Sequence, residues 1–294
     1  MYELDINKTR KTLFEISFDN IKKVKEKYNV EPFWVIMTSK ENHDQIINFF
    51  IEKNYFNYNK DKVLFFKQGQ KPILDINGKL VLENKYTIKQ ASNGNGDVFK
   101  SLQQSGILEK LKKNKIKYIS FSGIDNILAN PMDSSFIGIM ENKKYQIGSK
   151  SIFKQHDLEK SAVFCNIDNR PNILGYNYIT KELSNMKDEQ GKYLYRDKNI
   201  LAHIMTIEAV EKVAKIELKY NRAFKKNTYL DIESEKEKYI TENCFKFEKF
   251  IFDAFKYFEE MLILRVKEEK EFAPIKNSEN TKQAIELYLK KYKN

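Results

Sequence analysis

The spacing of apolar residues in the first part of the chain alternates between helix-like and strand-like patterns. Apolar positions three or four residues apart predict amphipathic helices over 17–28 and 41–55. Short apolar runs at 33–39 and 63–66 are typical of buried strands. The segment 75–84 is predicted to form a hairpin, because the Asn-Gly pair within it favours a tight turn.

A glycine-rich turn at 93–96 precedes a helical pattern that continues to about residue 115, and the run 118–125 predicts a strand that ends on Asp125. Strand, helix and strand in this order predict an α/β fold with a mixed, mostly parallel sheet flanked by helices. In such a sheet, ligands bind at the carboxyl ends of the strands.

The later segments follow a different pattern. The apolar positions predict a helix over 194–215 and a long amphipathic helix over 243–262, which follows a charged stretch that begins near residue 228. Residues 287–294 are polar, and we expect this end of the sequence to fray.

The composition is that of a globular protein, since 294 residues with 13% aromatics can form one large domain or two modest ones. Two cysteines and three histidines form neither a disulfide framework nor a zinc motif, which favours a reducing compartment. The sequence has no apolar run that could span a membrane and no secretory signal pattern. We therefore expect a cytoplasmic protein with no membrane partner.

The net charge of +11 raises the question of nucleic-acid binding, because phosphate backbones attract clustered cations. Only five of the 52 basic residues are arginines, and the lysines are scattered along the chain. Arginine is the residue that recognises phosphate and guanine in a bidentate manner. The charge therefore indicates a lysine-rich solvated surface, and we expect no nucleic-acid partner.

Two turns could carry chemistry. In the turn 93–97, glycines allow the backbone to approach a ligand, and free N–H groups suit an anion or a base edge. The alternative is a plain turn capped by Asn93 or Asp97. Asp125, which Asn126 follows, could hold Mg²⁺ beside the phosphates of a nucleotide, or the pair could simply form a helix cap or turn.

Basic and histidine side chains add less. Lys225 and Lys226 could neutralise phosphates, although a lysine pair in so lysine-rich a chain is typically a solvated surface. The three histidines show no metal-ligand spacing, and core or surface roles are expected for each of them: His43, His156 and His203.

Several segments, in their order and spacing, resemble the eukaryotic-type UDP-sugar pyrophosphorylases, and most of all the UDP-N-acetylglucosamine pyrophosphorylases. The resemblance extends from about Lys11 to Asn277, and its most specific stretch is KFEKFIFDAFKYFEEMLILRVKEEKEFAPIKN. The other segments that carry it are VIMTS (35–39), NFFIEKNYF (48–56), VLFFKQGQKP (63–72), NGNGDVFKSL (93–102) and GIDNILANP (123–131).

The resemblance implies a Rossmann-like nucleotidyltransferase fold. Residues 1–227 would form a catalytic domain that is incomplete at its N-terminal side, and residues 228–294 a small C-terminal α+β domain. The implied activity joins UTP to a sugar 1-phosphate, with N-acetylglucosamine 1-phosphate favoured, and releases pyrophosphate with Mg²⁺ as cofactor. Such a protein mainly positions two polyanions and neutralises their charge.

The resemblance also assigns roles to individual positions. Five of them would contact substrate: Gln68 and Gly94 the uracil, and Asn95, Tyr176 and Asn199 the sugar. Asp125 would bind the metal, and one of Lys225 and Lys226 would contact the phosphates.

Departures from the family pattern motivate a second hypothesis. The family's Gly-Gly-x-Gly-Thr-Arg-Leu-Gly phosphate loop would precede Lys11, where this sequence has no matching residues. Gly175 and Ala202 stand where the family has Glu and Asn, and Ala162 replaces a glycine. The second hypothesis is a non-catalytic fragment or relative that binds UDP-sugar without turnover.

Overall fold

The computed structural model describes residues 3–156, 161–175, 178–231 and 238–292. Contacts divide the chain into two compact units. Unit 1 comprises Met1–Phe33, Lys115–Val210 and Phe255–Asn294, and unit 2 comprises Trp34–Asn114 and Glu211–Ala254. The expected boundary between residues 227 and 228 stays a prediction. Within the described ranges, no helix combines the length and the apolar character needed to cross a membrane.

Unit 2 begins with two parallel strands joined through a helix and two short 3-10 helices: β3 (Trp34–Thr38), α2 (His43–Glu52), η1 (Asn54–Asn57), η2 (Lys60–Lys62) and β4 (Val63–Lys67). The predictions of this helix and both strands are confirmed. Phe50 on α2 is fully buried, and its ring centroid lies 5.1 Å from those of Trp34 and Phe65. This aromatic cluster ties the helix to both strands.

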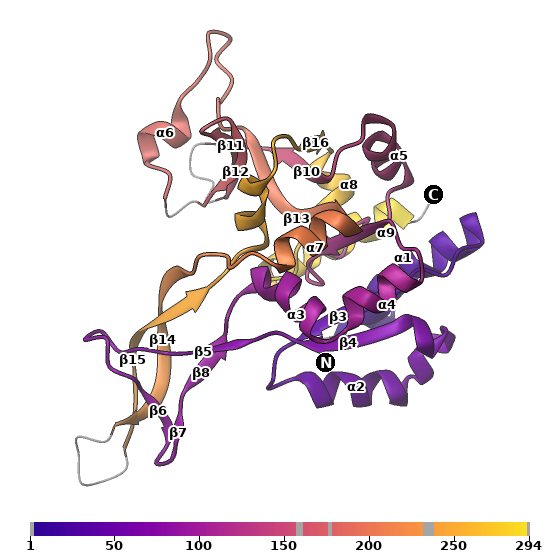
Figure 1. Ribbon diagram of the computed structural model, residues 1–294. Helices are drawn as coiled ribbons and strands as arrows, with labels where there is room; N and C mark the ends of the chain where they lie inside the picture. Colours follow the sequence, from indigo (N-terminus) through magenta and orange to yellow (C-terminus); the bar gives the residue numbers. More distant parts are fainter. Residues whose placement is uncertain (1–2, 157–160, 176–177, 232–237, 293–294) are drawn as a thin grey trace. The chain divides into compact units, whose positions relative to one another are not determined.

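A long antiparallel ribbon forms another part of unit 2 (Figure 1). Its two strands and the shorter pair beside them are β14 (Asn221–Asp231), β15 (Lys238–Glu248), β6 (Leu82–Asn84) and β7 (Thr87–Ile88). They pack around a buried cluster: Ile73, Val81, Tyr229 and Cys244. The predicted hairpin is confirmed here, since Leu74 pairs with Leu80 and Gly78 has a φ of +80° in the turn.

The remaining elements of unit 2 lead into and out of the glycine-rich turn. They are β5 (Gln70–Pro72), β8 (Gln90–Ser92), the 3-10 helix η3 (Asn95–Asp97), α3 (Val98–Gln104) and α4 (Ile107–Lys113). β5 and β8 pair antiparallel. Buried Phe99, Leu102 and Leu108 anchor the two helices. The prediction of a glycine-rich turn that opens a helix is therefore confirmed.

Six of the described strands form the main sheet of unit 1. They are β9 (Tyr118–Ser122), β10 (Ile147–Phe153), β11 (Val163–Ile167), β12 (Arg170–Leu174), β13 (Asp197–Thr206) and β16 (Leu262–Arg265). β13 runs antiparallel to β9, β10 and β11, whereas β10 and β16 are parallel. Among the described strands, parallel pairing is confined to β3–β4 and β10–β16, so the prediction of a mostly parallel sheet is wrong.

The physical reason is β13, which lies within the predicted helix 194–215. Only its last part is helical, as α7 (Ile207–Ala214). Ile200 and Ile204 of β13 are buried, and the backbone of β13 pairs with β9 and β10. This burial and pairing outweigh the helical spacing of the sequence. The antiparallel strand that organises the sheet was therefore missing from the sequence-based topology.

The predicted helix over 243–262 is also wrong. Its first residues belong to β15, followed by the 3-10 helix η4 (Ile251–Tyr257) and then by β16. Phe245 and Phe247 alternate along β15 and face Phe224 and Arg222 across the ribbon. A period of two residues is the strand signal, and dense phenylalanines obscured it.

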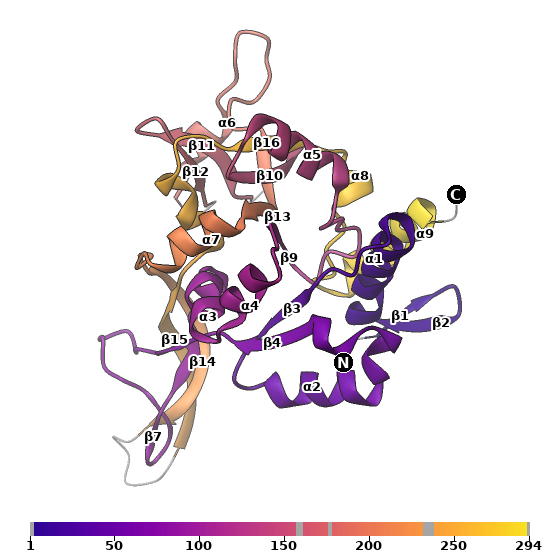
Figure 2. The ribbon, with the colours of Figure 1, turned by 45° about the vertical axis from the view of Figure 1, so that its right-hand side comes forward.

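The remaining elements of unit 1 include two helices, α1 (Leu13–Tyr28) and α9 (Ser278–Tyr292), that lie side by side (Figure 2). The others are β1 (Glu3–Ile6), β2 (Thr9–Thr12), α5 (Ser134–Lys143), α6 (Lys181–Asn185) and α8 (Glu268–Glu271). One buried cluster joins β1, α1 and α9: Leu4, Ile16, Leu128, Ala273, Ala284 and Tyr288. The expectation of a frayed end is therefore wrong as far as Tyr292, because α9 packs into this core.

His203 on β13 is fully buried in unit 1. Its Nδ1 lies 2.7 Å from Ser149 Oγ, and its ring centroid lies 5.0 Å from that of Phe255. Its Nε2 has no hydrogen-bond partner in the described part of the chain. Burial lowers the pKa of His203 to about 3, so the folded protein holds a neutral imidazole at neutral pH.

We expect the free energy of unfolding to fall as the pH decreases from 7 to 5. The unfolded chain binds a proton at His203 below about pH 6.5, whereas the folded imidazole stays neutral down to about pH 3. Between pH 6.5 and pH 3, His203 lowers the free energy of unfolding by at most about 1.4 kcal/mol for each unit by which the pH falls. Urea unfolding at pH 7 and pH 5, followed by circular dichroism, should show a smaller pH dependence for His203→Leu. Equal pH dependence in the two proteins would contradict this expectation.

Candidate functional site

The loop after β4 carries Gln68, the first candidate for uracil binding. The Gln68 N–H donates to Thr38 O at 2.8 Å, which continues the β3–β4 pairing past the end of β4. The side chain is half-buried, and its amide has no partner among the described residues. An amide offers a donor and an acceptor together, as a base edge requires.

The turn that carries Gly94 and Asn95 is closed by the end of β15. The Lys249 N–H donates to Asn93 O at 2.8 Å, and the Gly96 N–H donates to Lys249 O at 2.9 Å. Gly94 has a φ of +91°, and a Cβ there would lie 2.2 Å from Lys249 O. Only glycine fits this backbone, because the conformation is strained for other residues and the space is filled.

Asn95 lies in the same turn with one half of its amide engaged. Its Oδ1 accepts a hydrogen bond from the Ile251 N–H at 3.0 Å. Its Nδ2 has no partner in the described ranges and remains available as a donor. The structure thus holds the Asn95 side chain by its oxygen and leaves its nitrogen for a ligand.

Asp97 has a different role from the cap that the sequence suggested. Its side chain makes no hydrogen bond to the N-terminal N–H groups of α3. Instead, Oδ2 accepts from the Gly69 N–H at 2.9 Å and from Ser101 Oγ at 2.7 Å. The Asn93 N–H in turn donates to Gly69 O at 3.0 Å. These bonds bring Gln68, which precedes Gly69, together with the turn 93–97 in unit 2.

Lys249 is a residue of this region that the sequence did not single out. It is 3% exposed, and its Nζ lies 2.6 Å from Glu217 Oε1 and 4.6 Å from the Tyr220 ring centroid. Burial alone would lower the pKa of Lys249, but the hydrogen bonds to Glu217 and Tyr220 outweigh it and raise the pKa. The alternation of Phe245 and Phe247 is a strand signal. It could have predicted that Lys249, two residues further on, lies on the same face as these two side chains.

Asp125 lies just beyond β9 in unit 1. Its main-chain oxygen accepts from the Ile275 N–H at 2.8 Å, but its carboxylate has no partner among the described residues. A Cβ at Gly123 would lie 2.4 Å from Asp125 Oδ1, so the carboxylate folds back over a residue that must stay small.

Asn126 performs the turn-forming role that was left open for this pair. Its Oδ1 accepts from the N–H groups of Leu128 and Ala273, at 3.2 and 2.8 Å, and its Nδ2 donates to Glu271 O at 2.8 Å. The fold therefore engages both the oxygen and the nitrogen of the Asn126 amide. Because Asn126 stabilises the turn, the carboxylate of the neighbouring Asp125 is left to bind a ligand.

Asn199 lies at the same end of the sheet as Asp125. Ser122 on β9 pairs with Ala202 on the antiparallel β13, and both candidates lie beyond this pair. The pairing of β13 with β10 is irregular here, and Leu201 has a φ of +53°. The Leu201 N–H donates to Asn199 Oδ1 at 3.0 Å, which leaves the Asn199 Nδ2 without a partner in the described chain.

Lys225 and Lys226 occupy opposite faces of the β14–β15 ribbon, because successive side chains of a strand alternate. Lys225 Nζ lies 3.9 Å from Glu248 Oε2. Lys226 lies on the face of Arg222 and Phe224, and it makes no ion pair within the described residues. Only one of the two lysines can therefore serve a ligand on a given face.

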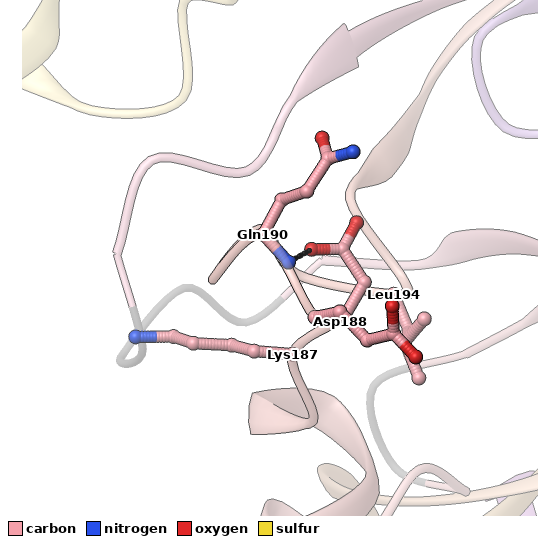
Figure 3. A pocket seen from close by; sticks show the side chains of 5 residues that line it. Lys187, Asp188, Gln190 and Leu194 are labelled. Atoms are coloured by element: carbon pink, nitrogen blue, oxygen red, sulfur yellow. Dashed lines mark hydrogen bonds between the residues drawn. The ribbon is translucent and has the colours of Figure 1, made fainter.

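Tyr176 falls outside the described residues. A cavity of about 460 Å³ lies in the loop that follows α6 (Figure 3), lined by Lys187, Asp188, Glu189, Gln190 and Leu194. There Asp188 Oδ1 accepts from the N–H groups of Gln190 and Lys192, so its carboxylate stabilises the turn. No predicted site residue lines this cavity.

The candidate residues suit Mg²⁺, which needs few protein ligands, better than a metal ion that several protein side chains enclose. The described residues contain no group of three or more His, Cys, Asp or Glu side chains that could hold a metal ion. Mg²⁺ typically binds through one or two carboxylates together with substrate phosphates and water. The unpartnered carboxylate of Asp125 fits that mode of binding.

The chain is similar to curated pyrophosphorylases. It is 34% identical to the "Probable UDP-N-acetylglucosamine pyrophosphorylase" of Dictyostelium discoideum, over 92% of this chain and 59% of that protein. It is 31% identical to the human UDP-N-acetylhexosamine pyrophosphorylase-like protein 1, over 92% of this chain and 55% of that protein. The chain thus spans just over half the length of these relatives.

The fold is also similar to a solved structure. The UDP-N-acetylglucosamine pyrophosphorylase of Trypanosoma brucei, in complex with an inhibitor, superposes with a TM-score of 0.85 at 26% identity. The match covers 98% of this chain and 61% of that one. Residues 3–290 match the family described as UTP–glucose-1-phosphate uridylyltransferase. The chain therefore belongs to this family, UDPGP, of UDP-sugar nucleotidyltransferases.

Proposed function

We propose that this protein is a uridylyltransferase that joins UTP to a sugar 1-phosphate, with N-acetylglucosamine 1-phosphate as the favoured substrate. One observation carries the proposal. In a chain of this family, four of the predicted site residues keep an unpartnered polar group among the described residues: Gln68, Asn95, Asp125 and Asn199. These groups are accessible to solvent and no other described residue engages them, so the fold leaves them free to bind a ligand.

The proposed roles follow from the groups that each residue offers. The amide of Gln68 and the N–H of Gly94 would bind the uracil, whose edge carries both donors and acceptors. The Nδ2 groups of Asn95 and Asn199 would donate to oxygens of the sugar. Lys226 is the better candidate for the phosphates, since Lys225 faces Glu248.

In the proposed reaction, an oxygen of the sugar phosphate attacks the α-phosphorus of UTP. The new O–P bond forms as the bond between the α-phosphorus and its bridging oxygen breaks, and pyrophosphate leaves with that oxygen. The protein contributes by holding both polyanions in line, which lowers the entropic part of the barrier. Mg²⁺ held by Asp125 would neutralise charge on the phosphates.

The test is pyrophosphate release from UTP and Mg²⁺ with three sugar 1-phosphates in parallel: those of N-acetylglucosamine, glucose and galactose. We expect release that requires a sugar phosphate and a kcat/KM that is highest with N-acetylglucosamine 1-phosphate. Equal or higher kcat/KM with glucose 1-phosphate would contradict the proposed sugar. Release with none of the three, once the family's glycine-rich phosphate loop is supplied, would contradict the proposed activity.

A non-catalytic role is the second candidate, and the glycine at position 175 favours it. In the family pattern this position carries a glutamate. This hypothesis expects UDP-N-acetylglucosamine to bind in calorimetry while no pyrophosphate is released. Turnover by the chain would rule it out.

Restoring the carboxylate should improve the use of sugar phosphate. Gly175 has room for a side chain, since its nearest contact to an added Cβ would be the Tyr178 ring at 3.4 Å. We expect Gly175→Glu to lower the KM for N-acetylglucosamine 1-phosphate about tenfold, as one charge-assisted hydrogen bond allows. Steady-state kinetics with Gly138→Glu, an exposed site on α5, controls for the added charge. An unchanged KM in Gly175→Glu would contradict the role given to this position.

A further inference from the structure

We infer that Asp97 is a positioning residue for the nucleotide: its carboxylate fixes the loop that carries Gln68 against the turn that carries Gly94 and Asn95. The inference rests on the proposed function, because it assigns a role to Asp97 in the binding of the uridine part of the substrate. Asp97 itself is 4% exposed, so it acts through Gly69 rather than by touching the ligand.

The geometry of the carboxylate supports this role. Both hydrogen bonds to Asp97 converge on Oδ2: the Gly69 N–H at 2.9 Å and Ser101 Oγ at 2.7 Å. Ser101 lies on α3 and is itself buried, so it anchors the carboxylate to a helix. Gly69 directly follows Gln68 in the chain. The hydrogen bond from the Gly69 N–H to Asp97 therefore fixes the backbone next to Gln68.

The packing around Gly69 makes this connection tight. A Cβ at Gly69 would lie 2.7 Å from Asn93 Nδ2 and 3.0 Å from Asp97 Oδ2. The loop and the turn are thus in direct contact, and a hydrogen bond from Asn93 N–H to Gly69 O closes the pair from the other side. Neither segment can shift without breaking a bond in the other.

The charge of the carboxylate is balanced inside the same region. Lys249 Nζ lies 4.0 Å from Asp97 Oδ1, and both side chains are nearly inaccessible to solvent. The main chain of Lys249 also bonds Asn93 and Gly96, so one residue supports the turn through its backbone and Asp97 through its ammonium. A buried carboxylate without such a partner would be strongly destabilising. Because Lys249 balances its charge, the Asp97 carboxylate can stay ionised in this buried position. An ionised carboxylate is a stronger acceptor for the Gly69 N–H than a neutral group would be.

A fixed loop matters because a ligand binds more tightly to groups that are already in place. The test compares UDP affinity, measured by calorimetry on the full 294-residue chain, with that of Asp97→Ala and Asp97→Asn. Asparagine keeps an oxygen that can accept the Gly69 N–H, whereas alanine has none. Asp44→Ala, at an exposed position of α2 in the same unit, is the control.

We expect Asp97→Ala to weaken UDP binding about tenfold and Asp97→Asn at most about threefold, with no change in the control. The measurements are made where circular dichroism shows each protein to be folded, so a merely structural role would leave the affinity of the folded protein unchanged. Hydrogen exchange of the Gly69 amide should be faster in Asp97→Ala. Equal UDP affinity in wild type and Asp97→Ala would overturn the inference.

Two other outcomes are also decisive. Should Asp97→Ala not fold, Ser101→Ala removes one of the two donors to Oδ2 and is expected to weaken UDP binding about threefold. Unchanged UDP affinity and unchanged Gly69 exchange in Ser101→Ala would overturn the inference. Wild-type protein that binds no UDP would contradict the proposed function itself, and there would then be no ligand for Asp97 to position.

Discussion

Replacing Asp125 by asparagine is expected to lower kcat for UDP-sugar formation by about two to three orders of magnitude. The carboxylate has no partner among the described residues, so the substitution removes a negative charge that the fold does not use. The main-chain bond from the Ile275 N–H to Asp125 O remains in place. The loss would therefore come from weaker metal binding and a less neutralised transition state, and not from unfolding.

The measurement for this variant is pyrophosphate release at saturating UTP and sugar phosphate over a series of Mg²⁺ concentrations. Asp168→Asn is the matched control, because Asp168 lies exposed in unit 1 in a left-handed turn that asparagine also tolerates. The control should retain full activity, and both variants should melt within a few degrees of wild type. Wild-type kcat in Asp125→Asn would remove Asp125 from the proposed chemistry.

Gly94→Ala is expected to cost about 4 kcal/mol of stability in unit 2 and to abolish UDP binding. Gly94 combines a φ of +91° with a neighbouring backbone, since an added Cβ would lie 2.2 Å from Lys249 O and 2.6 Å from Lys249 N. The backbone of Lys249 cannot move aside, because it bonds Asn93 and Gly96. Alanine would therefore force the turn 93–97 open.

Gly78→Ala is the matched control for the conformational part of this cost. Gly78 has a φ of +80° in the same unit, but an added Cβ there would meet nothing within 4 Å. Its replacement should cost only about 1–2 kcal/mol and leave UDP binding intact. Urea unfolding followed by the fluorescence of Trp34, the single tryptophan, reports on unit 2 directly. An equal loss of stability in Gly94→Ala and Gly78→Ala would show that the close contact with Lys249 does not add to the effect of the backbone conformation.

The local elements near the start of unit 2 could be predicted because their patterns and their packing agree. The apolar runs of β3 and β4 and the helical spacing around Phe50 match the surfaces that these elements bury. The glycine-rich turn was also predictable, since Gly94 adopts a backbone conformation that other residues strain to reach.

The topology could not be predicted for a physical reason. Ile200 and Ile204 of β13 have helical spacing, and only pairing with β9 and β10 makes that segment a strand. Strand pairing depends on partners far away in the sequence, which a local pattern does not contain. The error over β13 then led to the expectation of a mostly parallel sheet.

The sequence could suggest which residues belong to the candidate site, but it could not predict how they are arranged in space. The position of Gln68 beside the turn 93–97 depends on Gly69 and Asp97, and nothing in the local sequence signals that contact. Similarly, the alternation of a strand separates Lys225 from Lys226, which the sequence left as an undivided pair. The contact roles of these residues, Mg²⁺ dependence and the cytoplasmic location stay predictions.

The most direct test of the central claim is the reverse reaction, with UDP-N-acetylglucosamine, labelled pyrophosphate and Mg²⁺ added to the purified chain. A uridylyltransferase transfers the uridylyl group to pyrophosphate, so we predict that the label appears in UTP in amounts equal to the sugar 1-phosphate formed. Asp125→Asn should suppress this transfer. Binding of UDP-N-acetylglucosamine without label in UTP would contradict the proposed activity and favour a non-catalytic, UDP-sugar-binding relative.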